Sequence, residues 1–207
     1  MGTLDPEDDA IINVARDVFN RLGITGRTPS RIVWATEEYE PGQPAFGHGK
    51  LGLRRELKGK LSPNEWRPLM TSSLVLTTRL RRSRYMAGLV VLVGSLSVYS
   101  TLILFLFFRV FPLLPEAFFR GARSGAGLFT LFLFLGVVLF FARLTGPYRR
   151  KLRFVADQIT SDEFGMGTEL LSVLRKIDAF EIVRRGRYSN PFVRHATVAQ
   201  RIQNLSK

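Results

Sequence analysis

The chain contains no cysteine among its 207 residues. It therefore has no disulfides, no zinc sites built on thiolates and no thiol nucleophile. Histidine is almost as scarce, because His48 and His195 are the only two. A metal site or an acid–base mechanism that needs several imidazole groups is hard to assemble from this set, and we expect no bound cofactor.

Acidic side chains are also in short supply, since 17 Asp and Glu stand against 30 Lys and Arg and leave a net charge of +13. Such an excess indicates nucleic acid, an anionic membrane surface or an acidic partner as the binding target. Here basic clusters at 79–84 and 149–153 flank apolar segments. We interpret them as topology signals and contacts with membrane lipids. No RNA-binding aromatic motif accompanies them, so no nucleic acid is expected.

Charged side chains are absent from two long stretches, residues 86–108 and residues 124–142. A helix of 23 residues reaches roughly 34 Å, enough for a hydrocarbon core about 30 Å thick. The alternative is a pair of buried core helices, but a soluble domain of this size cannot cover two such helices on all faces. The two stretches therefore predict a transmembrane hairpin.

The distribution of Lys and Arg predicts the orientation of this hairpin. The outer flanks of the two predicted spans hold nine basic residues, whereas the connecting loop holds three. Both termini should then face the cytoplasm, in a multi-pass protein of the cell membrane. The N-terminus is acidic rather than apolar, and we interpret it as neither a signal nor a transit peptide. We expect residues 1–83 and 145–207 to form the two halves of one cytoplasmic domain around a hairpin at 84–144.

The rest of the chain predicts an α+β fold that is mostly helical with a small sheet. Apolar spacing indicates helices at 5–22, 148–160 and 168–183 and a short last helix around 198–205, a strand at 31–36, and a hairpin of short strands within 41–53. Ser62, Pro63 and Glu65 open a further helix with a capping box. We expect Pro68 to kink this helix, which then runs on into the first span.

Four segments, in this order around the two spans, resemble HtpX-type membrane zinc metalloproteases. They are residues 44–49 (Pro-Ala-Phe-Gly-His-Gly), residues 61–69 (Leu-Ser-Pro-Asn-Glu-Trp-Arg-Pro-Leu), residues 154–157 (Phe-Val-Ala-Asp) and residues 195–202 (His-Ala-Thr-Val-Ala-Gln-Arg-Ile). The resemblance covers roughly residues 30–207 and implies a zincin-like, metalloprotease-like domain interrupted by a helical hairpin.

The resemblance also places the family's zinc site on residues that do not suit it. Its two zinc histidines fall on Ser72 and Leu76, its catalytic glutamate on Ser73, and its third ligand on Arg153. Zinc needs about three protein donors and a water, with a carboxylate to take the proton of that water. Leu76 offers no donor and Arg153 brings a permanent cation. We therefore expect no metal and no catalytic residues.

Other family positions are retained as remnants. Asp157 and His195 match residues that support the family's zinc site, and Arg153 lies one helical turn before Asp157, so these two either fill the vacated site or form a solvated surface pair. Phe46 and His48 lie in the glycine-rich hairpin, where His48 is interpreted as a loop residue rather than a ligand. The basic loop with Arg184, Arg185 and Arg187 is the expected contact for an acidic protein partner.

Three hypotheses for function follow. The preferred one is a catalytically inactive pseudoprotease that binds a protein partner or an extended peptide, as a regulator of a protease or an accessory subunit of a membrane complex. The second is an active membrane metalloendopeptidase with an unrecognised metal site. A separate enzyme mechanism, with Ser72 or Ser73 as the nucleophile, would need an adjacent base. The third is a purely structural or lipid-binding membrane subunit. An open groove beside Ser72 and Ser73 favours binding, and a filled one favours the structural subunit.

Overall fold

The computed structural model describes residues 5–25, 28–36, 42–105, 125–144, 146–180 and 196–206. Within them the chain is mostly helical with one small three-stranded mixed sheet, as predicted. It divides into two compact units. Unit 1 comprises residues 1–81, 150–190 and 195–207, and unit 2 comprises residues 82–149 and 191–194.

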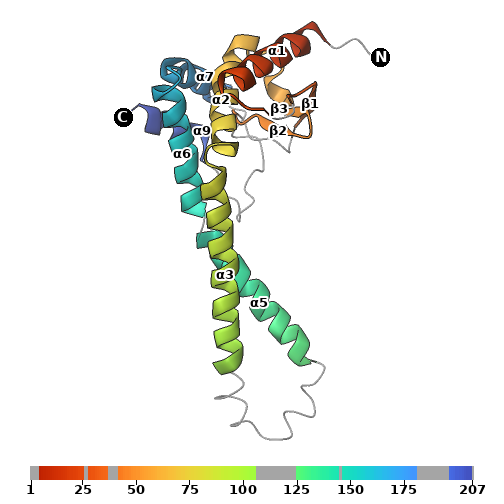
Figure 1. Cartoon of the computed structure of the whole chain (residues 1–207), viewed down its shortest axis with the longest axis vertical. Coiled ribbons are helices and arrows are strands. Elements are labelled where there is room, and N and C mark those ends of the chain that lie inside the picture. The colour runs from red at the N-terminus through yellow and green to blue at the C-terminus, as the bar shows by residue number, and fades with distance from the viewer. Residues whose placement is uncertain are drawn as a thin grey trace, which may run out of the picture. The chain divides into compact units, whose positions relative to one another are not determined.

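Unit 1 begins with helix α1 (Pro6–Arg21), which was predicted from its apolar spacing. The Asp5 carboxylate caps this helix by accepting a hydrogen bond from the backbone N–H of Glu7. Three acidic residues in the first turn favour the positive end of the helix dipole. The apolar side of α1 is buried and packs against the sheet and helix α2 (Trp66–Thr77) (Figure 1).

The sheet has the strand order β1-β3-β2. Strand β1 (Arg31–Ala35) pairs in parallel with β3 (Lys50–Arg54), and β2 (Ala45–Gly47) pairs with β3 in antiparallel register. His48 and Gly49 form the two-residue turn of this hairpin, and both have positive φ, 49° and 73°. That geometry is typical of a type I′ turn, which matches the twist of the strands. The predicted strand and hairpin are thus confirmed.

Helix α2 starts differently from the prediction. Ser62 and Glu65 form the expected capping box, in which the Glu65 carboxylate accepts a hydrogen bond from the Ser62 N–H at 2.6 Å. However, Pro63–Glu65 is a 3-10 turn, and the α-helix begins at Trp66. Pro68 consequently falls in the first turn of α2, where N–H groups need no partner within the helix. The prediction that Pro68 kinks the interior of a longer helix was wrong.

The predicted continuation of this helix into the first span was also wrong. α2 ends at Thr77, a turn covers residues 78–80, and α3 (Arg81–Phe105) begins after it. The hydroxyl groups of Thr77 and Thr78 donate hydrogen bonds to backbone carbonyls of the preceding turn, at 3.0 and 2.6 Å. Such side-chain bonds compete with the regular backbone pattern and favour a helix end.

Three helices complete unit 1. They are α6 (Gly146–Asp162), whose first four residues belong to unit 2, α7 (Gly167–Ala179) and α9 (Val198–Leu205). α7 and α9 pack against each other, and Thr197 caps α9 in a second capping box with Gln200. The core of unit 1 is built from α1, β3, α2, α7 and α9, with Trp66 and Leu174 among its fully buried side chains.

Unit 2 contains α3 and α5 (Gly125–Leu144). The two helices are antiparallel (Figure 1). Among the described residues one helix, α3, is long and apolar enough to cross a membrane. Its apolar side chains are largely exposed, among them Leu89, Val90 and Leu92. α5 covers the second predicted span, which remains a prediction, as does the multi-pass topology.

Candidate functional site

A buried polar cluster lies where α2, α6 and α9 meet in unit 1. Asp157 on α6 is its centre and is fully buried, with a relative exposure of 0%. Ser72 and Ser73 come from α2, Arg153 from α6 and Arg201 from α9, and each of them is at most 3% exposed. Polar groups that are buried this deeply in proteins are nearly always hydrogen-bonded. We call these five residues the Asp157 cluster.

Arg201 makes the strongest contacts with the central carboxylate. Its guanidinium donates two hydrogen bonds, from Nε to Asp157 Oδ2 and from Nη2 to Asp157 Oδ1, both at 2.8 Å. This is the bidentate geometry in which a guanidinium matches a carboxylate best. The third guanidinium nitrogen, Nη1, donates a hydrogen bond to the Gly42 carbonyl oxygen at 2.8 Å. Arg201 therefore fastens helix α9 both to α6 and to the loop that precedes β2.

The two α2 serines contact different members of the cluster. Ser72 Oγ donates to Asp157 Oδ1 at 2.5 Å, and Arg153 Nη1 donates to Ser73 Oγ at 3.4 Å. Arg153 also reaches the Gly42 carbonyl oxygen at 3.4 Å and lies 3.9 Å from Asp157 Oδ1. Two cations thus share one anion and one backbone carbonyl, which leaves the cluster with a net charge of +1.

These contacts decide the protonation state of Asp157. Burial raises the pKa of a carboxyl, and it is the largest single influence on Asp157. The positive charges of Arg201 and Arg153, with the hydrogen bonds from Arg201 and Ser72, together outweigh burial and hold the pKa of Asp157 below its ordinary value. Asp157 is therefore ionised at neutral pH, and it accepts protons poorly.

Gly42 is part of the site because of its backbone. Its φ of +72° lies in the left-handed region, which side chains with a Cβ rarely adopt. A Cβ at this position would lie 3.3 Å from Ile177 Cδ1 and 3.5 Å from Arg201 Nη1. Glycine therefore allows the loop to approach α7 and α9 closely and to present its carbonyl oxygen to both arginines.

The predicted site residues divide into four groups. Ser72, Ser73, Arg153 and Asp157 come together in the Asp157 cluster, and Arg153 and Asp157 are buried together rather than solvated. Leu76 is half-buried on α2. His195, Arg184, Arg185 and Arg187 lie outside the described residues.

The remaining two predicted residues lie in the hairpin. Phe46 on β2 packs its ring against Phe19 of α1, with a centroid distance of 5.5 Å. His48 is exposed in the turn and has the positive φ that asparagine, aspartate and histidine tolerate better than most residues. Neither residue contributes to the Asp157 cluster, and the geometry agrees with the interpretation of His48 as a loop residue.

The sequence analysis missed the part played by Arg201 and Gly42. Arg201 was present in the closing segment of the resemblance, residues 195–202, but was given no role there. Its partner Asp157 is 44 residues away in the chain. The only local signal for Gly42 is its place after Pro41 in a turn-rich stretch.

The Asp157 cluster does not fit the zinc ion that the resemblance implies. Zinc ligands in proteins are thiolates, imidazoles and carboxylates. The cluster offers one carboxylate, already bound by Arg201, and two hydroxyl groups, while two permanent cations occupy the same space. No group of three or more His, Cys, Asp or Glu side chains that could hold a metal occurs in the described part of the chain.

Comparisons of the chain with protein-family models, with curated proteins and with solved structures give no match.

Proposed function

We propose that this chain is a non-catalytic membrane protein built on an HtpX-like metalloprotease frame. The observation that carries the proposal is the Asp157 cluster. The residues aligned with one zinc histidine, the catalytic glutamate and the third zinc ligand are Ser72, Ser73 and Arg153, and all three belong to it. These residues are separated by some 80 positions in the sequence and meet in the cluster. The resemblance implies a metal site at these positions, and a buried ion pair is present instead.

The cluster is closed, which favours a structural role over peptide binding at this position. Ser72 and Ser73 are 0% and 2% exposed, Arg153 contacts Ser73, and Asp157, which Ser72 contacts, is bound by Arg201. A peptide could reach the serines only if the buried ion pairs were broken. We therefore propose an accessory or scaffolding subunit of a membrane complex, with its protein partner bound on the outer surface of unit 1.

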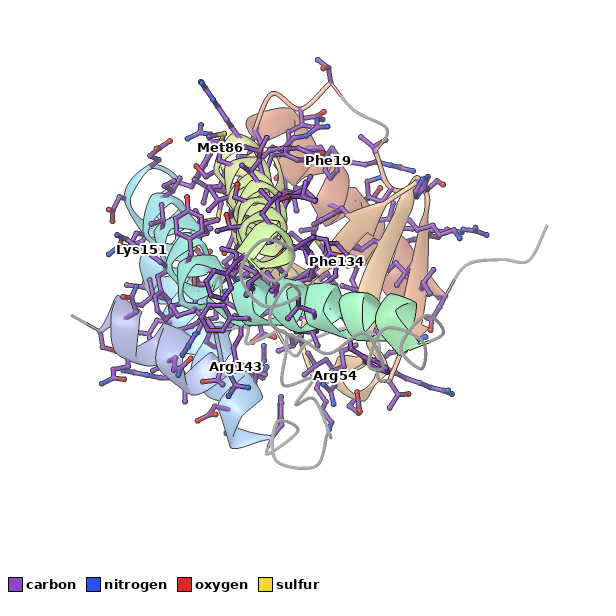
Figure 2. All side chains as sticks on the ribbon, turned by 90° about the horizontal axis from the view of Figure 1, so that it is seen from below. Phe19, Arg54, Met86, Phe134, Arg143 and Lys151 are labelled. Atoms are coloured by element: carbon purple, nitrogen blue, oxygen red, sulfur yellow. The ribbon has the colours of Figure 1, made fainter. Side chains whose placement is uncertain are left out.

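Unit 2 supports the membrane part of the proposal. The rings of Tyr99 on α3 and Phe134 on α5 are in edge-to-face contact, with centroids 5.2 Å apart. Phe134 is labelled in Figure 2. The midpoints of the two predicted spans are residues 97 and 133, so this contact joins the spans near their centres. Antiparallel helices that touch halfway along their apolar stretches are what a transmembrane hairpin requires. We propose this hairpin with both termini in the cytoplasm.

The two enzyme alternatives need groups that the cluster does not provide. A serine nucleophile requires a base that removes its proton. Ser72 does donate to a carboxylate, but the pKa of that carboxyl is lowered and two arginines neutralise its charge. A metallopeptidase with a different site would have to draw on ligands outside the described residues.

Proteolysis by the purified full-length chain tests the proposal. We expect no cleavage of casein above that of a Ser72→Ala control, with or without added zinc, because no group in the cluster activates water. Cleavage that a zinc chelator abolishes would contradict the proposal. Cleavage that resists the chelator and disappears in Ser72→Ala would contradict it too and would indicate a serine mechanism.

A further inference from the structure

The positive charge of the chain is confined to the segment that contains the proposed hairpin. Residues 66–156 hold 13 of the 30 Lys and Arg side chains but only one of the 17 Asp and Glu side chains, Glu116. This segment therefore carries +12 of the net charge of +13, and the remaining residues are nearly neutral. Residues 82–149 of unit 2 carry +6 of this charge, from seven arginines and Glu116.

Within unit 2, exposed basic side chains lie at the ends of the helices where the chain enters and leaves the proposed hairpin. Arg82 lies in the first turn of α3, Arg143 in the last turn of α5 and Arg149 near the start of α6, and all three are exposed. The Arg143 side chain is labelled in Figure 2. Since α3 and α5 run in opposite directions, these three residues belong to the same end of the hairpin.

Counting from the ring contact at Tyr99 and Phe134 gives the depth of two of these arginines along the helices. Arg82 is 17 residues from Tyr99 on α3, and Arg143 is nine residues from Phe134 on α5. At about 1.5 Å per residue, Arg82 lies roughly 25 Å from the contact and Arg143 about 13 Å. Half of a bilayer measures roughly 15 Å to the edge of the hydrocarbon and 20–22 Å to the outside of the headgroups.

Two tyrosines lie at the same end of the hairpin as these arginines. Tyr85 is 14 residues from Tyr99 on α3, which corresponds to roughly 21 Å, and Tyr148 lies near the start of α6. Both side chains are exposed, at 64% and 41%. Tyrosine is enriched at this level of membrane proteins because its ring and hydroxyl suit the boundary between lipid tails and water.

From the concentrated charge and the shared end of the hairpin we infer that this end is a binding surface for anionic phospholipid headgroups. Arg82 lies just outside the headgroups and its long side chain reaches back to the phosphates, where a guanidinium can bind phosphate oxygens with two hydrogen bonds. Arg143 starts at the edge of the hydrocarbon and reaches outward with its long side chain. The inference rests on the proposed membrane hairpin, and it adds a preference for lipids with net negative charge.

The test uses the full-length chain in vesicles of phosphatidylcholine mixed with phosphatidylglycerol, with spin-labelled forms of each lipid as probes. Electron paramagnetic resonance reports the fraction of each probe that the protein immobilises. At low ionic strength we expect the protein to favour phosphatidylglycerol at least about twofold, and added salt should weaken the preference. The triple variant Arg82→Gln, Arg143→Gln, Arg149→Gln should lose it.

The control variant Arg31→Gln, Lys50→Gln, Arg55→Gln removes the same charge from exposed positions of unit 1 and should keep the preference. Equal immobilisation of both probes by the unmodified chain, or equal losses in the two variants, would overturn the inference. Binding of duplex DNA through the three hairpin arginines without lipid preference would also overturn it. Extraction of the chain from the vesicles by carbonate would instead contradict the proposed hairpin itself, so the two failures are distinguishable.

Discussion

Asp157 binds Arg201 through two hydrogen bonds and lies 3.9 Å from Arg153 inside unit 1. An Asp157→Asn variant would remove the carboxylate that Arg201 binds, while the guanidinium group of Arg201 stays buried. Loss of one partner from a buried ion pair costs about 3–5 kcal/mol. We expect a loss of stability of this order, measured by the fluorescence of Trp34 and Trp66 during unfolding in detergent.

The Asp162→Asn variant provides the control, because Asp162 is exposed on the same helix. Substitutions at such positions change stability by about 0.5 kcal/mol or less. The pH dependence should separate the two as well. Because the folded pKa of Asp157 is lowered, its stabilisation is complete above the unfolded pKa of about 3.9 and is lost as the pH falls towards the folded pKa. The stability difference between the unmodified chain and Asp157→Asn should shrink below pH of about 4, and a constant difference would contradict this assignment.

At the scale of helices and strands, much of the fold could be predicted from the sequence. The apolar spacing of α1, α6, α7 and α9, the capping box before α2, and the glycine-rich hairpin are local signals that identified each element. The end of α2 was missed because no glycine or proline marks it between Thr77 and Arg81. The roles of Arg201 and Gly42 depend on the packing of distant segments, which no local pattern encodes.

The register of α2 against α6 allows a direct test of the resemblance. The variant Ser72→His, Ser73→Glu, Leu76→His, Arg153→Glu installs the ligands that the resemblance assigns to these four positions. It also removes one of the two cations. If the register is right, this variant should bind zinc with about one ion per chain. Isothermal titration with zinc measures this, after circular dichroism has shown that the variant is folded.

The matched control keeps Arg153 and carries only the three α2 substitutions. We expect it to bind zinc more weakly by at least about tenfold, because the third ligand is missing and the guanidinium repels the ion. A folded four-fold variant that binds zinc no better than this control would show that α2 and α6 are not aligned as the resemblance requires.

At the scale of the whole molecule, the charged residues and the buried residues are unevenly distributed along the chain. The segment at 66–156 is strongly basic and holds the long apolar stretches. The residues before and after it are nearly neutral and, together with Trp66, Leu69 and Met70 of α2, form the packed core of unit 1. Unit 1 is thus assembled from sequence on both sides of the proposed hairpin. The Asp157 cluster joins these two parts, because Gly42, Ser72 and Ser73 precede the hairpin and Arg153, Asp157 and Arg201 follow it.

The zinc content of the purified full-length chain tests the central claim most directly. The chain should be produced in zinc-supplemented medium, purified in detergent without chelators, and measured by inductively coupled plasma mass spectrometry. An ion-pair core in place of a metal site predicts far less than one zinc ion per chain, with the same value in Asp157→Asn. A content close to one zinc ion per chain, lost on substitution of Asp157, would contradict the claim that the Asp157 cluster holds no metal.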